Sequence, residues 1–379
     1  MTAPAGLLDT ATMRDELHPL DFHLPPELEA GAPPEARGLR RDDVRLMISR
    51  ISGGEIAHAR FGDIAGVLDE GDLLLINTSG TMNAALPAQR EDGTPLVVHL
   101  STHRSEECWV VELREPAERG TRPFGAGRSG ERLTLPEGGA LTLTTPHARV
   151  ADLPPAPIAV DPKRGPAGGI RLWNALLEVP APLDDYLLRN GQPIRYHYVD
   201  QSWPAEYYQT VYATDRGSAE MPSAGRAFTP ELITALVAKG VQIAPLLLHT
   251  GVASLEEHEP PYAEFFRVPA ITAEMVNIAK RDRRRIIAVG TTAVRAIETA
   301  VDDAGIVRAM EGWTELVVTR RHPPRVVNGL LTGLHEPRAT HLAMLESLAG
   351  ERHLRATYRE ALRAGYLWHE FGDLHLILP

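Results

Sequence analysis

The sequence predicts an α/β protein in which a mostly parallel sheet is covered by helices and carries an inserted β-barrel domain. Two observations lead to this fold class. From about residue 205 onward, strand-like and helix-like segments alternate along the chain, which is typical of a parallel sheet with helices on its faces. From about 83 to 180, short strands follow one another with little helical periodicity, which indicates an all-β unit.

Length and composition are those of a globular protein with more than one domain. The chain has 379 residues, of which 43% are hydrophobic and 23% charged, and this length favours two domains. No apolar run approaches the roughly 20 residues that span a membrane. The N-terminus lacks the basic leader and apolar segment of a secretion signal. We therefore expect a cytoplasmic protein without a membrane partner.

The first predicted strand of the main sheet, 71–79 (GDLLLINTS), precedes the all-β region. Within that region we expect strands at 95–102 and 108–115, and a hairpin at 132–145 whose PEGG segment forms the turn. The barrel is therefore an insertion in the α/β domain. The Pro- and Gly-rich segments that join its strands are predicted loops, at 116–126 and 161–169. The expected domains are the barrel, 83–180, and a discontinuous α/β catalytic domain, 1–82 and 181–379.

The strongest helix signal lies at 228–240 (FTPELITALVAKG). Thr229 is a typical N-cap residue, Pro230 suits the first helical position, and Gly240 ends the pattern. The buried face is expected to carry Leu232, Ile233, Leu236 and Val237. The alternation then continues with strands at 241–251, 286–290, 326–334 and 374–379, and with helices at 272–282, 292–305 and 338–350.

Cysteine content and charge exclude several classes of protein. The single cysteine, Cys108, cannot form an internal disulfide, and its apolar neighbours predict a thiol buried in a strand. A net charge of -11 argues against a protein that coats nucleic acid through bulk charge, but it permits local basic patches. Three runs are candidates, although each taken singly is more typical of a solvated face: 37–41, 280–285 and 319–325.

Familiar catalytic motifs are absent from the sequence. It has no paired-histidine metalloprotease motif, no serine hydrolase elbow, no dinucleotide fingerprint and no P-loop. His335 and His341 are six residues apart, which does not align them on one helical face. We therefore expect no metal site, and ordinary hydride or phosphoryl transfer lacks its usual marks.

Polar residues instead follow the predicted strands at their carboxyl ends. In open α/β sheets ligands bind beyond these ends, where helix N-termini present free N–H groups. Gly290 lets the backbone turn sharply after its strand, and the threonine that follows can cap the next helix. Each residue alone is more often structural, but together they predict one binding site: Asn77, Thr78, His249, Thr291, Thr292 and His335.

Eight segments, in order along the chain, resemble the S-adenosylmethionine:tRNA ribosyltransferase-isomerase family of queuosine biosynthesis. They are DFHLPPEL (from 21), FGDIAGVLDEGDLLLINTS (61), YYQTVYA (207), PSAGRAFTPELITALVAKG (222), LLLHTGVAS (246), IIAVGTTAVRAIE (286), LLTGLHEPRATHLAMLESLAG (330) and YLWHEFGDLHLIL (366). The motifs YQTVYA and VGTT-x-VR-x-(L/I)-E are the most specific. The resemblance implies an α/β domain with an inserted β-barrel, in agreement with the pattern above.

The resemblance also implies a reaction. The 7-aminomethyl-7-deazaguanine base of tRNA accepts the ribosyl part of S-adenosylmethionine, giving epoxyqueuosine-tRNA, adenine and methionine. S-adenosylmethionine is then a substrate, tRNA a partner, and no metal is implied. Such chemistry needs a base, a proton donor for the departing adenine and a cavity that holds both substrates.

Site residues follow from the resemblance. His249 and His258 are the expected catalytic residues, since a histidine pKa lies near neutrality, although His249 could instead only bond the backbone at a strand end. The expected S-adenosylmethionine-binding residues are Asn77, Thr78, Gly251, Gly290, Thr291, Thr292, Arg295 and His335. The expected residues for the second substrate are Tyr208, Gln209, Ser223 and Arg226. Arg295 and Glu298 could instead form only a surface ion pair.

The sequence departs from the family pattern around this site, so it resembles a divergent member. Glu264 is kept, but residues that the family usually has are replaced by Ser79, Ala84 or Ala85, Arg226, Ala227, Tyr262 and Gly333. The replaced residues include two arginines suited to phosphate or carboxylate binding. Three functions therefore stay open: the tRNA-modifying enzyme, a paralogue that uses S-adenosylmethionine with a small acceptor or cleaves it without tRNA, and a binding protein without turnover.

Overall fold

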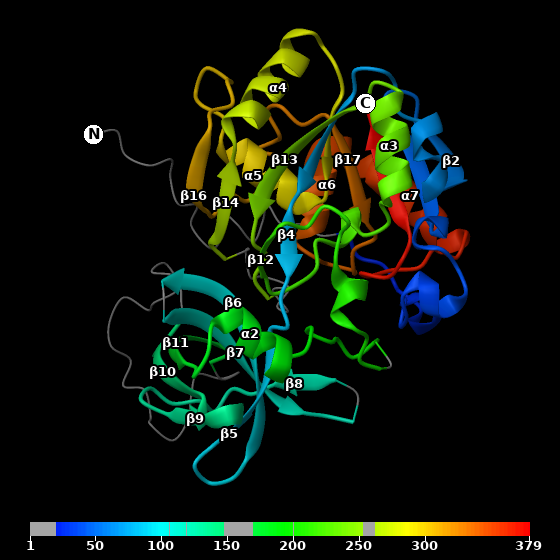
Figure 1. The fold of residues 1–379 in the computed structure, drawn as a ribbon. Coiled ribbons are helices and arrows are strands. Elements are labelled where there is room, and N and C mark those ends of the chain that lie inside the picture. Colours follow the sequence, from blue (N-terminus) through cyan, green and yellow to red (C-terminus); the bar gives the residue numbers. More distant parts are fainter. Residues whose placement is uncertain (1–19, 106, 119, 148–169, 200, 253–261) are drawn as a thin grey trace.

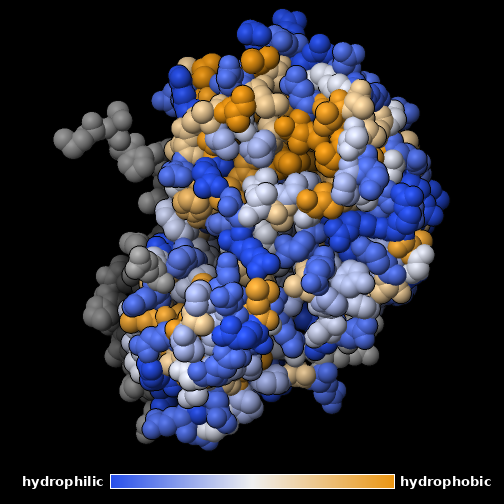
Figure 2. Space-filling model, viewed as in Figure 1, coloured by the Kyte–Doolittle hydropathy of each residue, from blue (hydrophilic) through white to orange (hydrophobic). Residues whose placement is uncertain are grey.

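The computed structural model describes residues 20–105, 107–118, 120–147, 170–199, 201–252 and 262–379. Figure 1 shows two bodies, a barrel and a larger part in which helices cover a sheet. Of the hydrophobic side chains visible on the face in Figure 2, the largest group lies over this larger part. The structure confirms the predicted fold class.

The main sheet has nine strands in the order β16-β14-β13-β3-β15-β17-β18-β1-β2. Its centre is parallel, because β13, β3, β15 and β17 all run the same way. The pairs β16–β14, β14–β13, β17–β18 and β1–β2 are antiparallel, so the sheet is mixed. The strands are β1 (Arg45–Arg50), β2 (Glu55–Arg60), β3 (Leu73–Asn77), β13 (Gln242–Leu248), β14 (Glu264–Val268), β15 (Ile286–Val289), β16 (Met310–Thr314), β17 (Gly329–Gly333) and β18 (Leu374–Leu378).

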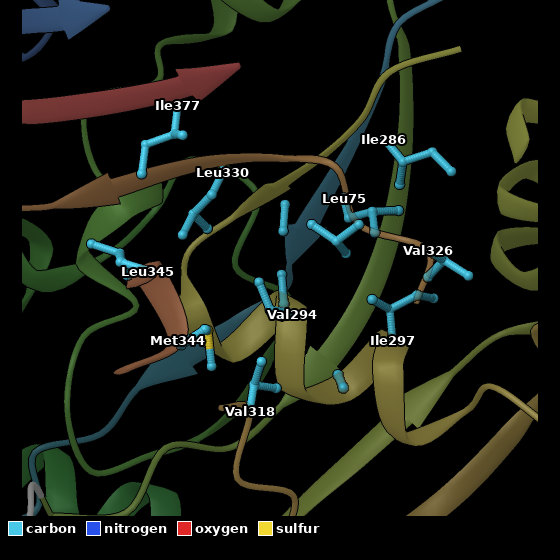
Figure 3. Packing of buried hydrophobic residues seen from close by; sticks show 14 of the residues in the cluster. Leu75, Ile286, Val294, Ile297, Val318, Val326, Leu330, Met344, Leu345 and Ile377 are labelled. Carbon is cyan, nitrogen blue, oxygen red and sulfur yellow. The ribbon is translucent and has the colours of Figure 1, made fainter. Parts of the chain in front are cut away.

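Helices cover both faces of this sheet, which explains why every residue of β3, β15 and β18 is buried. Alternate residues of β3 face opposite sides, so Leu75 packs in one core and Leu74 in another. Leu75 shares its core with Val294 and Leu345 (Figure 3). The helices of that core are α4 (Ala270–Arg281), α5 (Thr291–Thr299), α6 (His341–Ala349) and α7 (Glu351–Arg363), and the core around Leu74 contains residues of α3 (Pro230–Ala238).

The barrel is closed because β11, the strand at one end of the sheet order, pairs antiparallel with β7. Its strands are β5 (Ala85–Gln89), β6 (Pro95–Ser105), β7 (Cys108–Pro116), β9 (Arg132–Thr134), β10 (Ala140–Pro146) and β11 (Leu172–Glu178), with β8 (Thr121–Pro123) added beside β7. Helix α2 (Leu183–Asn190) places Tyr186 and Leu187 in the barrel core. The packing of this all-β unit therefore continues past residue 180.

Short elements complete the described chain. Strand β4 (Ser79–Thr81) pairs in parallel with β12 (Asp215–Ser218). Single 3-10 turns lie at η1 (Pro26–Leu28), η2 (Pro34–Arg37), η3 (Arg41–Asp43), η4 (Phe61–Gly66), η5 (Pro136–Gly138), η7 (Ala205–Tyr208) and η8 (Ser223–Gly225). The turn η5 joins β9 to β10, as the PEGG segment predicted. The predicted loop 161–169 lies outside the described residues.

Helix α3 begins as its sequence predicts. The Thr229 hydroxyl accepts a hydrogen bond from the N–H of Leu232 at 3.1 Å, and Pro230 occupies the first helical position. Gly240 follows the helix with φ of 91°. One expectation is wrong: Val237 is 57% exposed. Of the four apolar residues expected on the buried face of α3, only Leu232 and Leu236 are buried.

Several other boundaries differ from the prediction. Helix α5 ends at Thr299, not 305, because Val301 then pairs with Val307 across a turn. Cys108 lies in a strand, as expected, but it is partly exposed and not buried. The structure also contains elements that were not predicted: β1, β2, β14, β16, α2 and α7.

Candidate active site

A cavity of about 420 Å³ lies where the main sheet meets the barrel side of the molecule. This volume is within the roughly 300–1,000 Å³ of small-molecule sites. Its lining includes Gly251 after β13, residues 290–292 after β15 and His335 after β17. Ser101 of the barrel and Tyr196 also line it. The strand ends predicted to form a site therefore do converge, except at β3 and at His249.

The N-terminus of α5 forms one wall of the cavity. Gly290 precedes the helix with φ of 92° and ψ of 154°, and its N–H donates to Leu331 O at 2.8 Å. Thr291 and Thr292 are the first two residues of α5, and both line the cavity. The first N–H groups of a helix have no partner within it and carry partial positive charge. This wall therefore suits a carboxylate or another electron-rich group.

A buried ion pair lies behind the α5 wall. Arg295 and Glu264 contact each other, and both line the cavity. The arginine also donates to Leu316 O at 3.0 Å and to Thr314 O at 3.2 Å. The second carboxylate oxygen of Glu264 accepts from the N–H of Gly251 at 2.8 Å. This network fixes Gly251 and the α5 helix relative to each other.

Arg295 is thus not part of a surface ion pair with Glu298, as one alternative had it. Arg295 is 7% exposed and Glu298 8%. Glu298 accepts hydrogen bonds from the N–H groups of Arg325, Val326 and Val327. The two residues are three apart on α5, but each is engaged by a different part of the chain.

Two histidines stack in the cavity wall. The rings of His335 and His341 have centroids 4.7 Å apart and an interplanar angle of 4°. Spacing along one helix did not suggest this pair, because His335 precedes α6 and the chain turns between them. Burial and the neighbouring rings hold the pKa of His335 well below its usual range. The His335 ring is therefore neutral at pH 7, whereas His341, at the start of α6, is exposed to solvent.

An acidic wall lies beside these histidines. The Tyr198 hydroxyl donates to Glu370 Oε2 at 2.8 Å, and the Tyr198 ring stacks on His369 at 3.8 Å between centroids. His369 Nε2 in turn lies 3.1 Å from Glu29 Oε1. Burial raises the pKa of Glu370 to about 7. These groups could donate or accept protons in the cavity.

The structure does not bring His249 into this cavity, which corrects the expectation that it shares a site with Thr291. His249 lines a hollow with Asp215 and Arg267 and a second one that also contains Ser101, whereas the next residue, Thr250, lines the main cavity. Successive side chains of an extended segment point to opposite sides. The imidazole Nδ1 is 2.8 Å from Ser79 Oγ, and burial lowers its pKa to about 4. His249 lies at a strand end, as the alternative had it, but its ring contacts the Ser79 hydroxyl, and no contact of the ring with the backbone is seen among the described residues.

The other predicted site residues divide into two groups. Tyr208, Ser223 and Gly251 line the cavity, together with Gly290, Thr291, Thr292, Arg295 and His335. Four residues make internal contacts outside it: Asn77, Thr78, Gln209 and Arg226. Asn77 ties β3 to Leu248 at 2.8 Å and so holds two strand ends together. His258 lies outside the described residues.

Arg226 shows why one of these predictions failed. Its guanidinium donates to Glu35 Oε2 and to Tyr207 O, each at 2.7 Å, and it is 3% exposed. The cation also lies over the Phe371 ring, 5.2 Å from the centroid. Arg226 therefore braces the back of the cavity wall and does not itself line the cavity.

The basic runs are largely engaged inside the chain. Arg41 pairs with Glu35, Arg285 with Asp72 and Arg320 with Glu346. Other members donate to backbone carbonyls or pair with adjacent carboxylates: Arg37, Arg40, Lys280, Arg281, Arg284 and Arg325. The basic residues of these runs therefore stabilise the fold through internal contacts and do not serve only as a solvated surface.

Tyr198, His341, His369 and Glu370 also line the cavity, although they were not predicted as site residues. His369 and Glu370 precede β18, and a parallel sheet would place them at the edge away from the site. Because β18 runs antiparallel to β17, Gly333 pairs with Leu374 and the two residues lie at the same edge as His335. The polar WHE triplet before the last strand was the available signal.

The described residues contain neither a cluster suited to a metal ion nor a helix suited to span a membrane. No group of three or more His, Cys, Asp or Glu side chains in this part of the chain could hold a metal ion. Among the same residues, no helix has both the length and the apolar character needed to cross a membrane.

Comparison with known proteins places this site in a family. The family model described as queuosine biosynthesis protein matches residues 17–377. Proteins named S-adenosylmethionine:tRNA ribosyltransferase-isomerase from Desulfitobacterium hafniense and Thermus thermophilus are 33% and 34% identical to the chain, cover 96% of it, and are themselves covered to 100% and 99%.

A solved S-adenosylmethionine tRNA ribosyltransferase from Thermotoga maritima has 27% identity and a TM-score of 0.49, with 95% of this chain and 99% of that one covered. The family model and the relatives together span nearly the whole chain. The protein therefore belongs to the queuosine biosynthesis protein family of transferase-isomerase enzymes.

Proposed function

We propose that the protein transfers the ribosyl part of S-adenosylmethionine to the 7-aminomethyl-7-deazaguanine base of tRNA in the cytoplasm and isomerises it, giving epoxyqueuosine-tRNA, adenine and methionine. The observation that carries this proposal is the single cavity in which the α5 N-terminus, the Arg295–Glu264 pair and the wall of His335, His341 and Glu370 face one space. The printed names of the relatives support the substrate classes.

The cavity offers a partner for each part of S-adenosylmethionine. The free N–H groups of Thr291 and Thr292 suit the methionine carboxylate, since helix N-termini bind anions. Tyr196, Tyr198 and Tyr208 line the cavity and offer aromatic surface to the adenine ring and the sulfonium. Gly251, Gly290, Ser223 and His335 are the further residues that we expect to contact the two substrates.

The chemistry requires two proton transfers, and the wall of His335, His341 and Glu370 offers groups that can make them. A base must remove a proton from a carbon next to the positively charged sulfur, and a donor must protonate the leaving adenine. Burial of the walls removes competing water and strengthens electrostatic interactions inside the cavity. His249 has no part in this scheme, because it lines the hollow that contains Asp215 and Arg267 and does not line the cavity.

A second candidate is transfer to a small acceptor, or cleavage of S-adenosylmethionine, without tRNA. The internal engagement of the basic runs favours it, since cations that pair with Glu35, Asp72 and Glu346 are less available to phosphates. Ser79 also stands where the family usually has an arginine, and its hydroxyl is engaged by Ser218 at 2.6 Å.

One experiment separates these functions. Purified protein is incubated with S-adenosylmethionine, with precursor tRNA and without it, and the products are identified by mass spectrometry. Adenine release that requires tRNA, together with a ribosyl adduct on the tRNA, supports the first function. Release or another cleavage product in the absence of tRNA supports the second, and binding without consumption contradicts both.

A further inference from the structure

Glu370 is a partly buried residue of the cavity wall whose hydrogen bonding is incomplete. It lines the cavity, and its Oε2 accepts the hydrogen bond of Tyr198 at 2.8 Å. Its other oxygen, Oε1, is buried and has no hydrogen-bond partner among the described residues. A buried polar atom without a partner costs free energy, so such atoms are rare in folded proteins. A group kept at this cost calls for a functional explanation.

The backbone before Glu370 is strained in a way that points to the same conclusion. His369 has φ of 72°, in the left-handed region that residues other than glycine seldom occupy. Such strain persists only where the surrounding structure enforces it, and it concentrates at functional sites. Here Gly372 N–H donates to His369 O at 3.0 Å, and Glu29 holds the ring of His369 at 3.1 Å.

The same turn positions the hydrogen-bond partner of Glu370. The ring of Tyr198 lies on the ring of His369, with an interplanar angle of 9°. Because its ring is held there, the phenol hydroxyl is directed at Glu370. Tyr198 lies 172 residues from Glu370 in the chain, so only the tertiary structure forms this pair.

Burial and the charges around Glu370 bring the pKa of its carboxyl group close to neutral pH. Burial raises its pKa to about 7, whereas the Tyr198 hydrogen bond and the charge of Arg226 act in the opposite direction and Glu336 adds to the rise. Tyr208 also faces it, from η7. A base with a pKa near the working pH transfers protons most effectively. His335, with its lowered pKa, is a weaker base.

We propose that Glu370 is the base that takes a proton from the carbon next to the sulfonium of bound S-adenosylmethionine, and that Tyr198 is its positioning residue. The C–H bond breaks, its electron pair stays on the carbon beside the positive sulfur, and the proton forms an O–H bond on the carboxylate. This inference rests on the proposed use of S-adenosylmethionine.

The test compares Glu370→Gln with the unaltered protein in two measurements. Glutamine keeps the shape but cannot take the proton. We expect adenine release to fall by about 100-fold or more, with the affinity for S-adenosylmethionine, measured by calorimetry, within about threefold. Glu346→Gln is the matched control: it removes a buried carboxylate of α6 that pairs with Arg320 and does not line the cavity, so its rate should stay within about threefold.

A second variant keeps the test decisive if Glu370→Gln fails to fold. In Tyr198→Phe the carboxylate loses a hydrogen bond that favours its charged form, so its pKa rises. The rate depends on the ionised base, and the midpoint of the rising limb of the pH profile should move to higher pH. A purely structural role of Tyr198 would not move that midpoint.

The outcomes distinguish this inference from the function on which it rests. If the unaltered protein neither binds nor consumes S-adenosylmethionine, the proposed function itself is wrong. If it releases adenine and Glu370→Gln does so within about threefold of the same rate, only the role of Glu370 is overturned. Loss of binding along with the rate in Glu370→Gln, or an unmoved pH midpoint in Tyr198→Phe, would also overturn that role.

Discussion

At the scale of single residues, Arg295 and Glu264 show how the site is built into the core. Two charges that are removed from water must be paired, because either one left alone is costly. The pair is more than an isolated contact, since Glu264 also holds the N–H of Gly251 and Arg295 holds the carbonyls of Leu316 and Thr314. Positioning of the cavity wall and stability of the fold therefore depend on the same atoms.

We predict that Arg295→Met destabilises the protein by about 3–5 kcal/mol, because Glu264 is left as a buried unpaired charge. In the double variant Arg295→Met/Glu264→Gln no charge remains, so its loss should be smaller than the sum of the two single losses. The free energy of unfolding from denaturant titration measures all three. Additive losses would show that the two side chains do not act as a pair.

His249 gives a prediction that tests where the reaction takes place. Its ring faces the hollow lined by Asp215 and Arg267 and not the cavity. We therefore expect His249→Ala to lower adenine release by less than tenfold, through its contacts with Ser79 and Phe265. A loss of about 100-fold, as expected of an acid or base, would place the chemistry on the other side of β13. Steady-state rates of the two proteins decide between these outcomes.

Glu370 should also affect stability as a function of pH. Its pKa is raised from 4.5 to about 7 in the folded protein, so the folded state holds the proton over this interval while the unfolded state has lost it. The carboxyl therefore costs no stability at low pH, and stability is lost as the pH rises through this interval. We expect Glu370→Gln to raise the Tm by roughly 1–3 °C at about pH 8 and to change it little near pH 5. Equal shifts at both pH values would contradict a raised pKa.

At the scale of elements, the described helices and strands reflect local signals that their own sequences carry. Helix α3 is the plainest example, since Thr229, Pro230 and Gly240 mark its two ends. Helix α5 differs, because Gly290 both ends β15 and opens the helix, so a single residue directs the N-terminus into the cavity. The residues at the ends of α3 thus define the extent of that helix, whereas the residue at the start of α5 also shapes the site.

We predict that Thr229→Ala destabilises the protein by about 1 kcal/mol, because the N–H of Leu232 loses its partner at the start of α3. Thr234→Ala is the control on the same helix, since Thr234 is exposed and alanine favours helix. Thermal unfolding of both variants measures the difference. Equal effects would mean that the cap contributes nothing beyond helix propensity.

At the scale of the whole molecule, the cavity joins the two parts of the fold. Ser101 belongs to the barrel and Ile194 to its core, whereas Thr291 and His335 belong to the main sheet and its helices. A ligand in the cavity must therefore contact both parts, and its binding free energy would hold them together.

We predict that S-adenosylmethionine slows hydrogen exchange at 290–295 and at 194–198 together, because both segments line the cavity. At a concentration about 100 times its dissociation constant, it should raise the free energy of unfolding by about 2.7 kcal/mol. Exchange followed by mass spectrometry tests the first expectation and thermal unfolding the second. Protection confined to one segment would show that the ligand does not bridge the two parts.

The sequence by itself determined the layers of this protein. Hydrophobic periodicity, cap residues and turn residues act over a few neighbours, so α3, the hairpin of β9 and β10, and the alternation of strands and helices around β15 could be predicted. The convergence of Thr291 and His335 also followed, since parallel strands end at one edge.

Only the tertiary structure decided which side chains face the cavity. The antiparallel direction of β18 brings Glu370 to the edge where β17 ends, and no local pattern encodes the direction in which a distant strand is paired. A shift of one position along the segment after β13 turns His249 away and Thr250 inward. Contacts such as Tyr198 with Glu370 depend on packing between segments far apart in the chain, because proximity there is set by the burial of the whole core and not by neighbours in sequence.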